Sequence, residues 1–113
     1  MHEMGLMDAM LRMIDKIKAE QELEGINKIV LEVGALSGVV PRFLEECFEA
    51  VSDGTDYEDT ELEIEVVPGT LRCNDCGLEF PADVENLFCP ECMSKKLTPM
   101  TGKDLTLKEL QAY

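Results

Sequence analysis

The sequence has little of several residue types, and each shortage excludes a class of function. Its 113 residues contain no tryptophan and one histidine, His2. Ten basic side chains stand against 24 acidic ones, so the formal net charge is -14. A nucleic-acid binder is expected to present a basic surface, which argues against nucleic acid as a partner. Since the only histidine lies at the terminus and no nucleophile has an evident base, we expect no enzymatic activity.

Long apolar runs are also missing. No run approaches the roughly 18 residues of a membrane span. The N-terminus does not resemble a signal peptide, because Asp8, Arg12 and Asp15 interrupt its apolar residues. We therefore expect a cytoplasmic protein without stable membrane insertion. In a reducing compartment, paired cysteines indicate a metal site more than disulfides.

Apolar periodicity predicts an α+β fold. An amphipathic helix is expected over residues 4–23, with Gly25 placed to end it, and a second helix is expected from Pro41. Alternating segments predict strands at 26–33, at 62–66 and near the C-terminus, the last marked by Leu105, Leu107 and Leu110 with an irregularity after Lys108. The metal-binding segment described next would then be inserted into the main body before its last strand.

Four of the five cysteines form two Cys-x-x-Cys knuckles, with twelve residues between them: Cys73, Cys76, Cys89 and Cys92. Four thiolates at about 2.3 Å saturate a tetrahedral zinc ion and leave no open position, which predicts a structural zinc site. Independent redox pairs, disulfides and a rubredoxin-like iron centre are the competing interpretations. The colour expected of ferric thiolate would distinguish iron from zinc.

The remaining sulfur-containing residues are interpreted as core. Cys47 lies in the apolar stripe of the second helix, where a free thiol behaves as a small hydrophobe. Four methionines recur every third residue in the first helix: Met4, Met7, Met10 and Met13. Thioethers select copper(I) more than nickel(II), and at helical spacing methionines usually fill a core.

The first three residues can chelate a metal ion. The Met1 amine, the His2 amide and imidazole and the Glu3 amide are close enough to form five- and six-membered chelate rings. Deprotonated amides and imidazole suit square-planar nickel(II) or copper(II). The His2 amide has only two neighbouring corners in such a plane, yet three groups would have to lie beside it. At least one of the four must therefore be axial or give way to an outside ligand.

Three groups of residues carry a resemblance to a known family: Met1-His2-Glu3, the segment from Val33 to Val39 followed by Pro41, and the two knuckles. Together they resemble the HypA/HybF family of hydrogenase nickel-incorporation proteins. The resemblance implies a metallochaperone that delivers nickel(II) as cargo to the large subunit of nickel-iron hydrogenase. It also implies a nucleotide-hydrolysing accessory protein as partner, nickel at Met1, His2 and Glu3, and structural zinc at the four cysteines.

The chain departs from some relatives at a few positions. Those relatives have histidines beside the knuckles, where Gly77 and Met93 stand here, and an acidic side chain near position 40, where this chain has Val40. The resemblance therefore does not by itself imply histidine-dependent switching of the zinc site or a link to urease. If nickel needs an extra ligand, Glu3 or a partner must supply it.

The resulting hypothesis is an α+β protein with a nickel-binding domain of two helices on a three-stranded sheet and an inserted zinc ribbon. The nickel domain is expected at residues 1–69 plus 100–113, and the ribbon at 70–99. Two alternatives are a zinc-ribbon adaptor that only docks proteins and an electron carrier with iron in the cysteines. The sequence leaves open whether the protein forms a homodimer.

Overall fold

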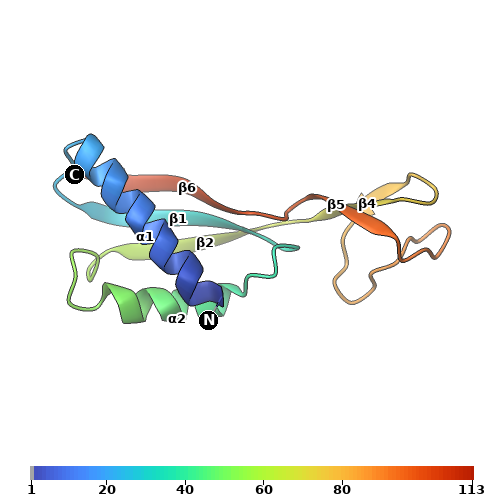
Figure 1. Cartoon of the computed structure of the whole chain (residues 1–113), viewed down its shortest axis with the longest axis horizontal. Helices are drawn as coiled ribbons and strands as arrows, with labels where there is room; N and C mark the ends of the chain where they lie inside the picture. The colour runs from blue at the N-terminus through green and yellow to red at the C-terminus, as the bar shows by residue number, and fades with distance from the viewer. Residues whose placement is uncertain (1) are drawn as a thin grey trace.

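The computed structural model describes residues 2–113, with the side chain of His2 outside the described part. Its elements follow in the order α1 (His2–Glu20), β1 (Ile26–Gly34), α2 (Pro41–Ser52), β2 (Glu61–Val67), β3 (Thr70–Cys73), β4 (Glu79–Pro81), β5 (Leu97–Thr101) and β6 (Leu105–Ala112). These elements form two three-stranded sheets (Figure 1). We call β2-β1-β6 with its helices the body, and residues 70–101, which hold β4-β3-β5, the ribbon.

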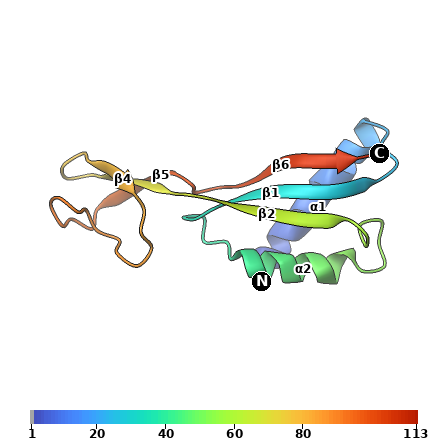
Figure 2. The same ribbon diagram turned by 180° about the vertical axis from the view of Figure 1, so that it is seen from behind.

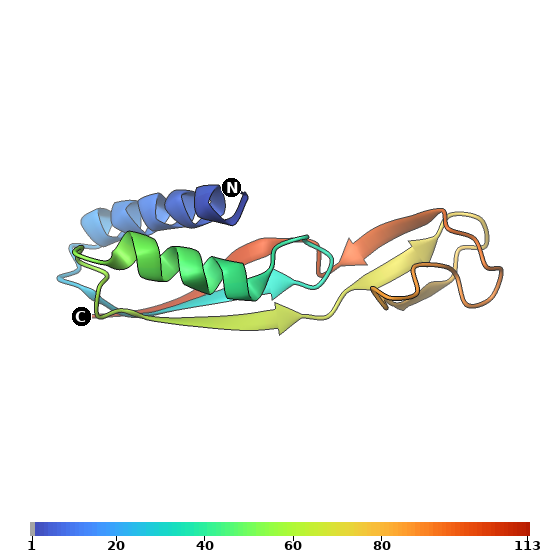
Figure 3. The same cartoon turned by 90° about the horizontal axis from the view of Figure 1, so that it is seen from below.

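The body is built on β1, its central strand. Strand β1 pairs with β2 in parallel and with β6 in antiparallel. Both helices lie on one face of this sheet (Figure 3), and no helix of the described residues covers the opposite face (Figure 2). The predicted α+β fold with two helices on three strands is confirmed. Among residues 2–113, no helix has the length and apolarity that crossing a membrane requires.

The ribbon extends away from the body and makes the molecule long. The chain measures 54 × 25 × 17 Å, with a radius of gyration of 17.4 Å. A compact domain of this length would have a radius of about 13 Å. Strand β3 pairs in antiparallel with β4 and β5. The division into domains at residues 69 and 100 stays a prediction.

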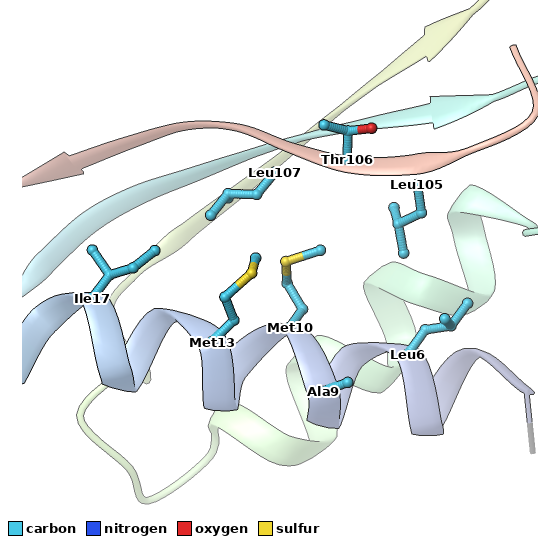
Figure 4. A pocket seen from close by; sticks show the side chains of 8 residues that line it. All are labelled: Leu6, Ala9, Met10, Met13, Ile17, Leu105, Thr106 and Leu107. Carbon is cyan, nitrogen blue, oxygen red and sulfur yellow. The ribbon is translucent and has the colours of Figure 1, made fainter. Parts of the chain in front are cut away.

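Apolar side chains between the helices and the sheet form the core of the body. The fully buried ones include Met7, Ile14, Leu31 and Leu44. The methionine stripe is only partly core, because Met13 is 42% exposed. Met13 lies beside β6 in an open apolar groove of about 600 Å³ (Figure 4). The groove arises because α1 crosses the sheet obliquely and its side chains do not reach all of β6 (Figures 1 and 4).

Helix α1 ends three residues earlier than predicted. The Leu23 N–H donates to the Lys18 carbonyl at 2.9 Å, and Glu22 takes a left-handed backbone with φ of 52°. This is the Schellman arrangement, in which a left-handed residue just past the helix satisfies its last carbonyls. The prediction that Gly25 ends the helix was therefore wrong. Gly25 instead leaves room for the ring of Tyr113.

The irregularity predicted in the last strand is confirmed as a bulge. Val30 is paired with Glu109 and Leu31 with Leu107, so Lys108 has no partner residue on β1. The extra residue keeps the leucines of β6 on the helix-covered face. The Lys108 ammonium binds the Glu65 carboxylate at 2.7 Å.

Three chain segments meet where the body joins the ribbon, and we call residues 34–37, 67–69 and 102–104 the neck. The Leu36 N–H donates to the Gly102 carbonyl at 2.7 Å, and the Ala35 N–H to the Val67 carbonyl at 2.9 Å. A Cβ on Gly34 would collide with the Gly102 carbonyl, and one on Gly69 would lie 2.6 Å from the Leu36 side chain. The glycines thus allow the backbones to approach closely.

Candidate metal centres

The four predicted zinc ligands converge at the far end of the ribbon. Their Sγ atoms all lie within 4.8 Å of one another. The Sγ atoms of Cys73 and Cys92 are 3.5 Å apart, and those of Cys76 and Cys89 are 3.6 Å apart. Four bonds of about 2.3 Å in a tetrahedron require sulfur separations of about 3.8 Å. The cluster therefore has the size of a four-thiolate metal site.

The two knuckles have the same backbone geometry. The N–H groups of Gly77 and Met93 donate to the carbonyls of Cys73 and Cys89, both at 2.9 Å. The N–H groups of those two cysteines donate in turn to the carbonyls of the residues five positions later, Leu78 and Ser94, both at 2.8 Å. Each knuckle is thus a closed turn that holds its first sulfur in place.

The residue after each knuckle has a left-handed backbone. The φ angle is 79° at Gly77 and 64° at Met93. Glycine adopts this conformation without cost, whereas an ordinary L-residue is strained there. The sequence predicts the role of Gly77 but gives no sign that Met93 takes the same conformation.

Side chains outside the cysteines hold the knuckles together. The Ser94 hydroxyl donates to the Asp75 carboxylate, and the Thr98 hydroxyl donates to the Asn74 side-chain oxygen at 2.7 Å. The Asn74 N–H also donates to the Lys96 carbonyl, at 2.8 Å. These contacts join the first knuckle to the second and to β5. Sequence reasoning missed them, because Asp and Asn inside a knuckle have no distinctive spacing.

The thiols have very different pKa values. Hydrogen bonding from the Cys76 amide, and then from the Asp75 amide, lowers the pKa of Cys73 to about 6 despite its burial. The Ser94 amide acts in the same direction on Cys92, but the neighbouring Cys73 thiol, burial and two further thiols together raise that pKa to about 12. The pKa of Cys76 is also raised, since its favourable contact with the Leu78 amide is outweighed by Cys89, burial and Cys73. Four thiols this close need a cation before all of them ionise.

The donor set fits a structural zinc ion. Cys73 is 1% exposed and Cys89 0%, while Cys76 and Cys92 lie on the surface. One sulfur of each knuckle is therefore buried, and the other covers the site from outside. Four thiolates complete the tetrahedron around the ion. A bound zinc ion would therefore have no free coordination position for a substrate.

The N-terminal site is only partly visible. Met1 and the His2 side chain lie outside the described part of the chain, so their predicted nickel-binding role stays a prediction. Helix α1 begins at His2, and the first four amides of an α-helix have no partner within it. The Glu3 amide therefore has no intrahelical acceptor. The Glu3 side chain is 7% exposed, and its Oε2 accepts a hydrogen bond from the Val40 N–H at 3.4 Å.

The fifth cysteine belongs to the core, as predicted. Cys47 is 3% exposed and lies among the buried side chains of the body, including Leu44 and Phe48. It takes no part in the thiol cluster, which the other four cysteines form within residues 3–113.

Comparison with known proteins places this chain in a family. Residues 1–112 match the family model described as "Hydrogenase/urease nickel incorporation, metallochaperone, hypA". The chain is 34% identical over 111 residues to the hydrogenase maturation factor HypA of Aquifex aeolicus, covering 98% of this chain and 96% of that protein. It is 38% identical over 113 residues to HypA of Geobacter metallireducens, covering 98% of each.

The fold agrees with this relationship. The solution structure of the nickel metallochaperone HypA from Helicobacter pylori superposes with a TM-score of 0.69 at 20% identity, covering 97% of this chain and 96% of that one. The predicted resemblance is therefore confirmed, and the chain belongs to the HypA family of hydrogenase and urease nickel-incorporation metallochaperones.

Proposed function

We propose that this protein carries nickel(II) to the large subunit of nickel-iron hydrogenase during maturation of that enzyme. The observation that carries the proposal is the chelating tripeptide Met1-His2-Glu3 at the start of a chain that matches the metallochaperone family over residues 1–112. Related proteins of similar length are described as hydrogenase maturation factors. The protein acts as a carrier and catalyses no reaction of its own.

Nickel is the cargo, and the first three residues are its proposed ligands. The Met1 amine, the His2 amide and imidazole and the Glu3 amide supply nitrogen donors of the kind that square-planar nickel(II) prefers. Because these four groups do not all fit one plane around the ion, one position stays available for exchange. A ligand of the receiving site can bind the ion at this position before the first ligands dissociate, so the ion stays bound to protein throughout the transfer.

Zinc has a separate, structural role in this proposal, and Cys73, Cys76, Cys89 and Cys92 are its ligands. A zinc ion closed by four thiolates has no open position and does not exchange with the cargo. The zinc-ribbon domain at residues 70–99 would stand apart from the nickel domain at 1–69 plus 100–113. This separation lets one end of the molecule carry nickel while the other is available to other proteins.

The proposed partners are a nucleotide-hydrolysing accessory protein and the hydrogenase large subunit, both met in the cytoplasm. Residues 1–69 hold five basic and 17 acidic side chains, a net charge of -12. A surface of this charge attracts metal cations and basic protein surfaces and repels nucleic acid.

A nickel titration tests the proposal. Untagged, zinc-loaded protein is titrated beside His2→Ala, and both bound metals are counted. The carrier function predicts one nickel per chain, its loss in His2→Ala, and about one zinc retained in both proteins. If His2→Ala binds nickel as well as the parent, the terminus is not the site, and a zinc-ribbon adaptor becomes the better account.

A further inference from the structure

The start of α2 lacks the residues that usually stabilise a helix N-terminus. Its cap position is Val40, which has no side-chain acceptor, and no acidic residue occupies its first turn. Pro41 follows, and Arg42 then places a positive charge near the positive end of the helix dipole. A carboxylate at this point would offset both deficits.

Glu3 supplies that carboxylate from a different helix. Its Oε2 accepts the Val40 N–H across 37 positions of sequence, and the side chain is 7% exposed. The starts of α1 and α2 lie near each other at the ribbon-facing end of the body (Figure 1). A buried carboxylate is costly unless it is hydrogen-bonded, so the contact with Val40 offsets part of the cost of burying Glu3.

The loop that carries the donating Val40 N–H is itself held in place. The Ser37 hydroxyl donates to the Gly34 carbonyl at 2.6 Å and accepts the Val39 N–H at 3.2 Å. Leu36 is bound to Gly102 across the neck. The loop before Val40 is therefore fixed to β1 and to the neck, and it offers Glu3 an ordered donor.

We propose that Glu3 is a positioning residue whose carboxylate docks the first turn of α1 on the start of α2. The proposal rests on the nickel-carrier function above and deepens it. The Glu3 amide stays available to nickel, while the carboxylate is committed to Val40 and is not the extra ligand. Docking orders the residues next to the chelating nitrogens before the ion arrives, so less conformational entropy is lost on binding.

Three variants of zinc-loaded, untagged protein separate a positioning role from a ligand role: Glu3→Gln, Glu3→Ala and, as a control for the lost charge, Glu46→Gln on the exposed face of α2. Glutamine retains an oxygen that accepts the Val40 N–H, whereas it is a poor nickel ligand. Glu3→Gln and Glu46→Gln should therefore bind nickel within a factor of about three of the parent, with the same nickel absorption spectrum. Glu3→Ala should bind about five- to tenfold more weakly, the effect of one lost hydrogen bond. If Glu3→Gln loses as much affinity as Glu3→Ala and its spectrum shifts, the carboxylate is a ligand and the proposal fails.

A second measurement needs no nickel. Hydrogen exchange of the Val40 amide, followed by NMR in nickel-free protein, should be at least about fivefold faster in Glu3→Ala and close to the parent rate in Glu3→Gln. Amides of β1 report on the fold and should not change. An unchanged Val40 amide in Glu3→Ala overturns the proposed docking. The His2→Ala titration tests nickel carriage separately, so failure of the carrier function is distinguishable from failure of this contact.

Discussion

The body and the ribbon are stabilised in different ways. The body buries many aliphatic side chains between helices and sheet, whereas within residues 70–101 the buried apolar residues are Leu71 and the two inner cysteines. The ribbon leaves Val84 and Leu87 exposed on its long loop. Burial of apolar surface can stabilise the body alone, but it cannot stabilise the ribbon. The ribbon's fold must therefore come from its metal.

Removing zinc should have the largest effect, and it should be confined to the ribbon. Chelation, or the substitution Cys76→Ser, removes binding free energy of about 10 kcal/mol or more that the ribbon uses to fold. In two-dimensional NMR, the amide signals of residues 70–101 should collapse to unfolded positions while those of β1 persist. Cys47→Ala is the matched control and should keep one zinc per chain. Loss of the β1 signals together with the ribbon would show that the two parts do not fold separately.

Zinc affinity should depend steeply on pH. The raised pKa values of Cys76 and Cys92 keep both thiols protonated at pH 7 without metal, so zinc must displace at least these two protons. Affinity then falls as pH falls, by at least about a hundredfold per unit near neutrality. Cys73, with a pKa of about 6, adds a further proton below that pH. Calorimetry in buffers of different ionisation enthalpy counts the released protons, and a count below two would contradict the described pKa pattern.

Enlarging a cavity in the body should leave the ribbon intact. Leu31 is 0% exposed, so Leu31→Ala should lower the free energy of unfolding by about 3 kcal/mol. Leu87→Ala, at a position that is 49% exposed, should change it by less than about 0.5 kcal/mol. Denaturant unfolding followed by circular dichroism measures both, and the zinc content should stay the same. A large effect of Leu87→Ala would reveal packing in the ribbon that the structure does not show.

The parts of the molecule that follow local rules were predictable from sequence. Periodicity located the two helices and the three strands of the body, and the spacing of the cysteines identified the four-thiolate site, because both patterns repeat over short distances. The short strands β3, β4 and β5 of the ribbon were not predicted. The end of α1 was misplaced because Glu22, a residue with no preference for the left-handed region, occupies it. The hydrogen bond between Glu3 and Val40 joins residues far apart in the chain, and so do the backbone hydrogen bonds at the neck. Local sequence patterns do not predict such contacts.

Substitutions of glycine test whether the close approach of the backbones at the neck leaves room for a side chain. In Gly34→Ala the new methyl group would collide with the Gly102 carbonyl, and the strain should cost about 1–3 kcal/mol. Gly5 lies in α1 with no neighbour within 4 Å of an added Cβ, so Gly5→Ala should stabilise by up to about 1 kcal/mol. Thermal unfolding compares the pair. Equal effects of the two substitutions would show that the close approach at the neck carries no strain.

The smallest effect is expected for substitutions of the left-handed residue that follows each knuckle. Met93→Gly should relieve a left-handed residue and stabilise the zinc-bound ribbon by about 1 kcal/mol, while Gly77→Ala should destabilise it by a similar amount. Competition with a chelator should show zinc affinity changes of about fivefold in opposite directions. Effects of the same sign at these equivalent positions would contradict the repeated geometry of the knuckles.

The glycine contact at the neck also bears on how the ribbon could be exchanged during evolution. The chain leaves the body at Gly69 and returns at Gly102, and a Cβ on Gly102 would lie 2.7 Å from the Gly69 Cα. With respect to the body, the whole ribbon is therefore one long loop whose two ends are in contact. The entropy of closing such a loop grows only slowly with its length, by about 0.6 kcal/mol for each doubling. Insertions, deletions or replacement of the entire metal module should therefore cost the body little free energy, so the ribbon can change while the body keeps its fold.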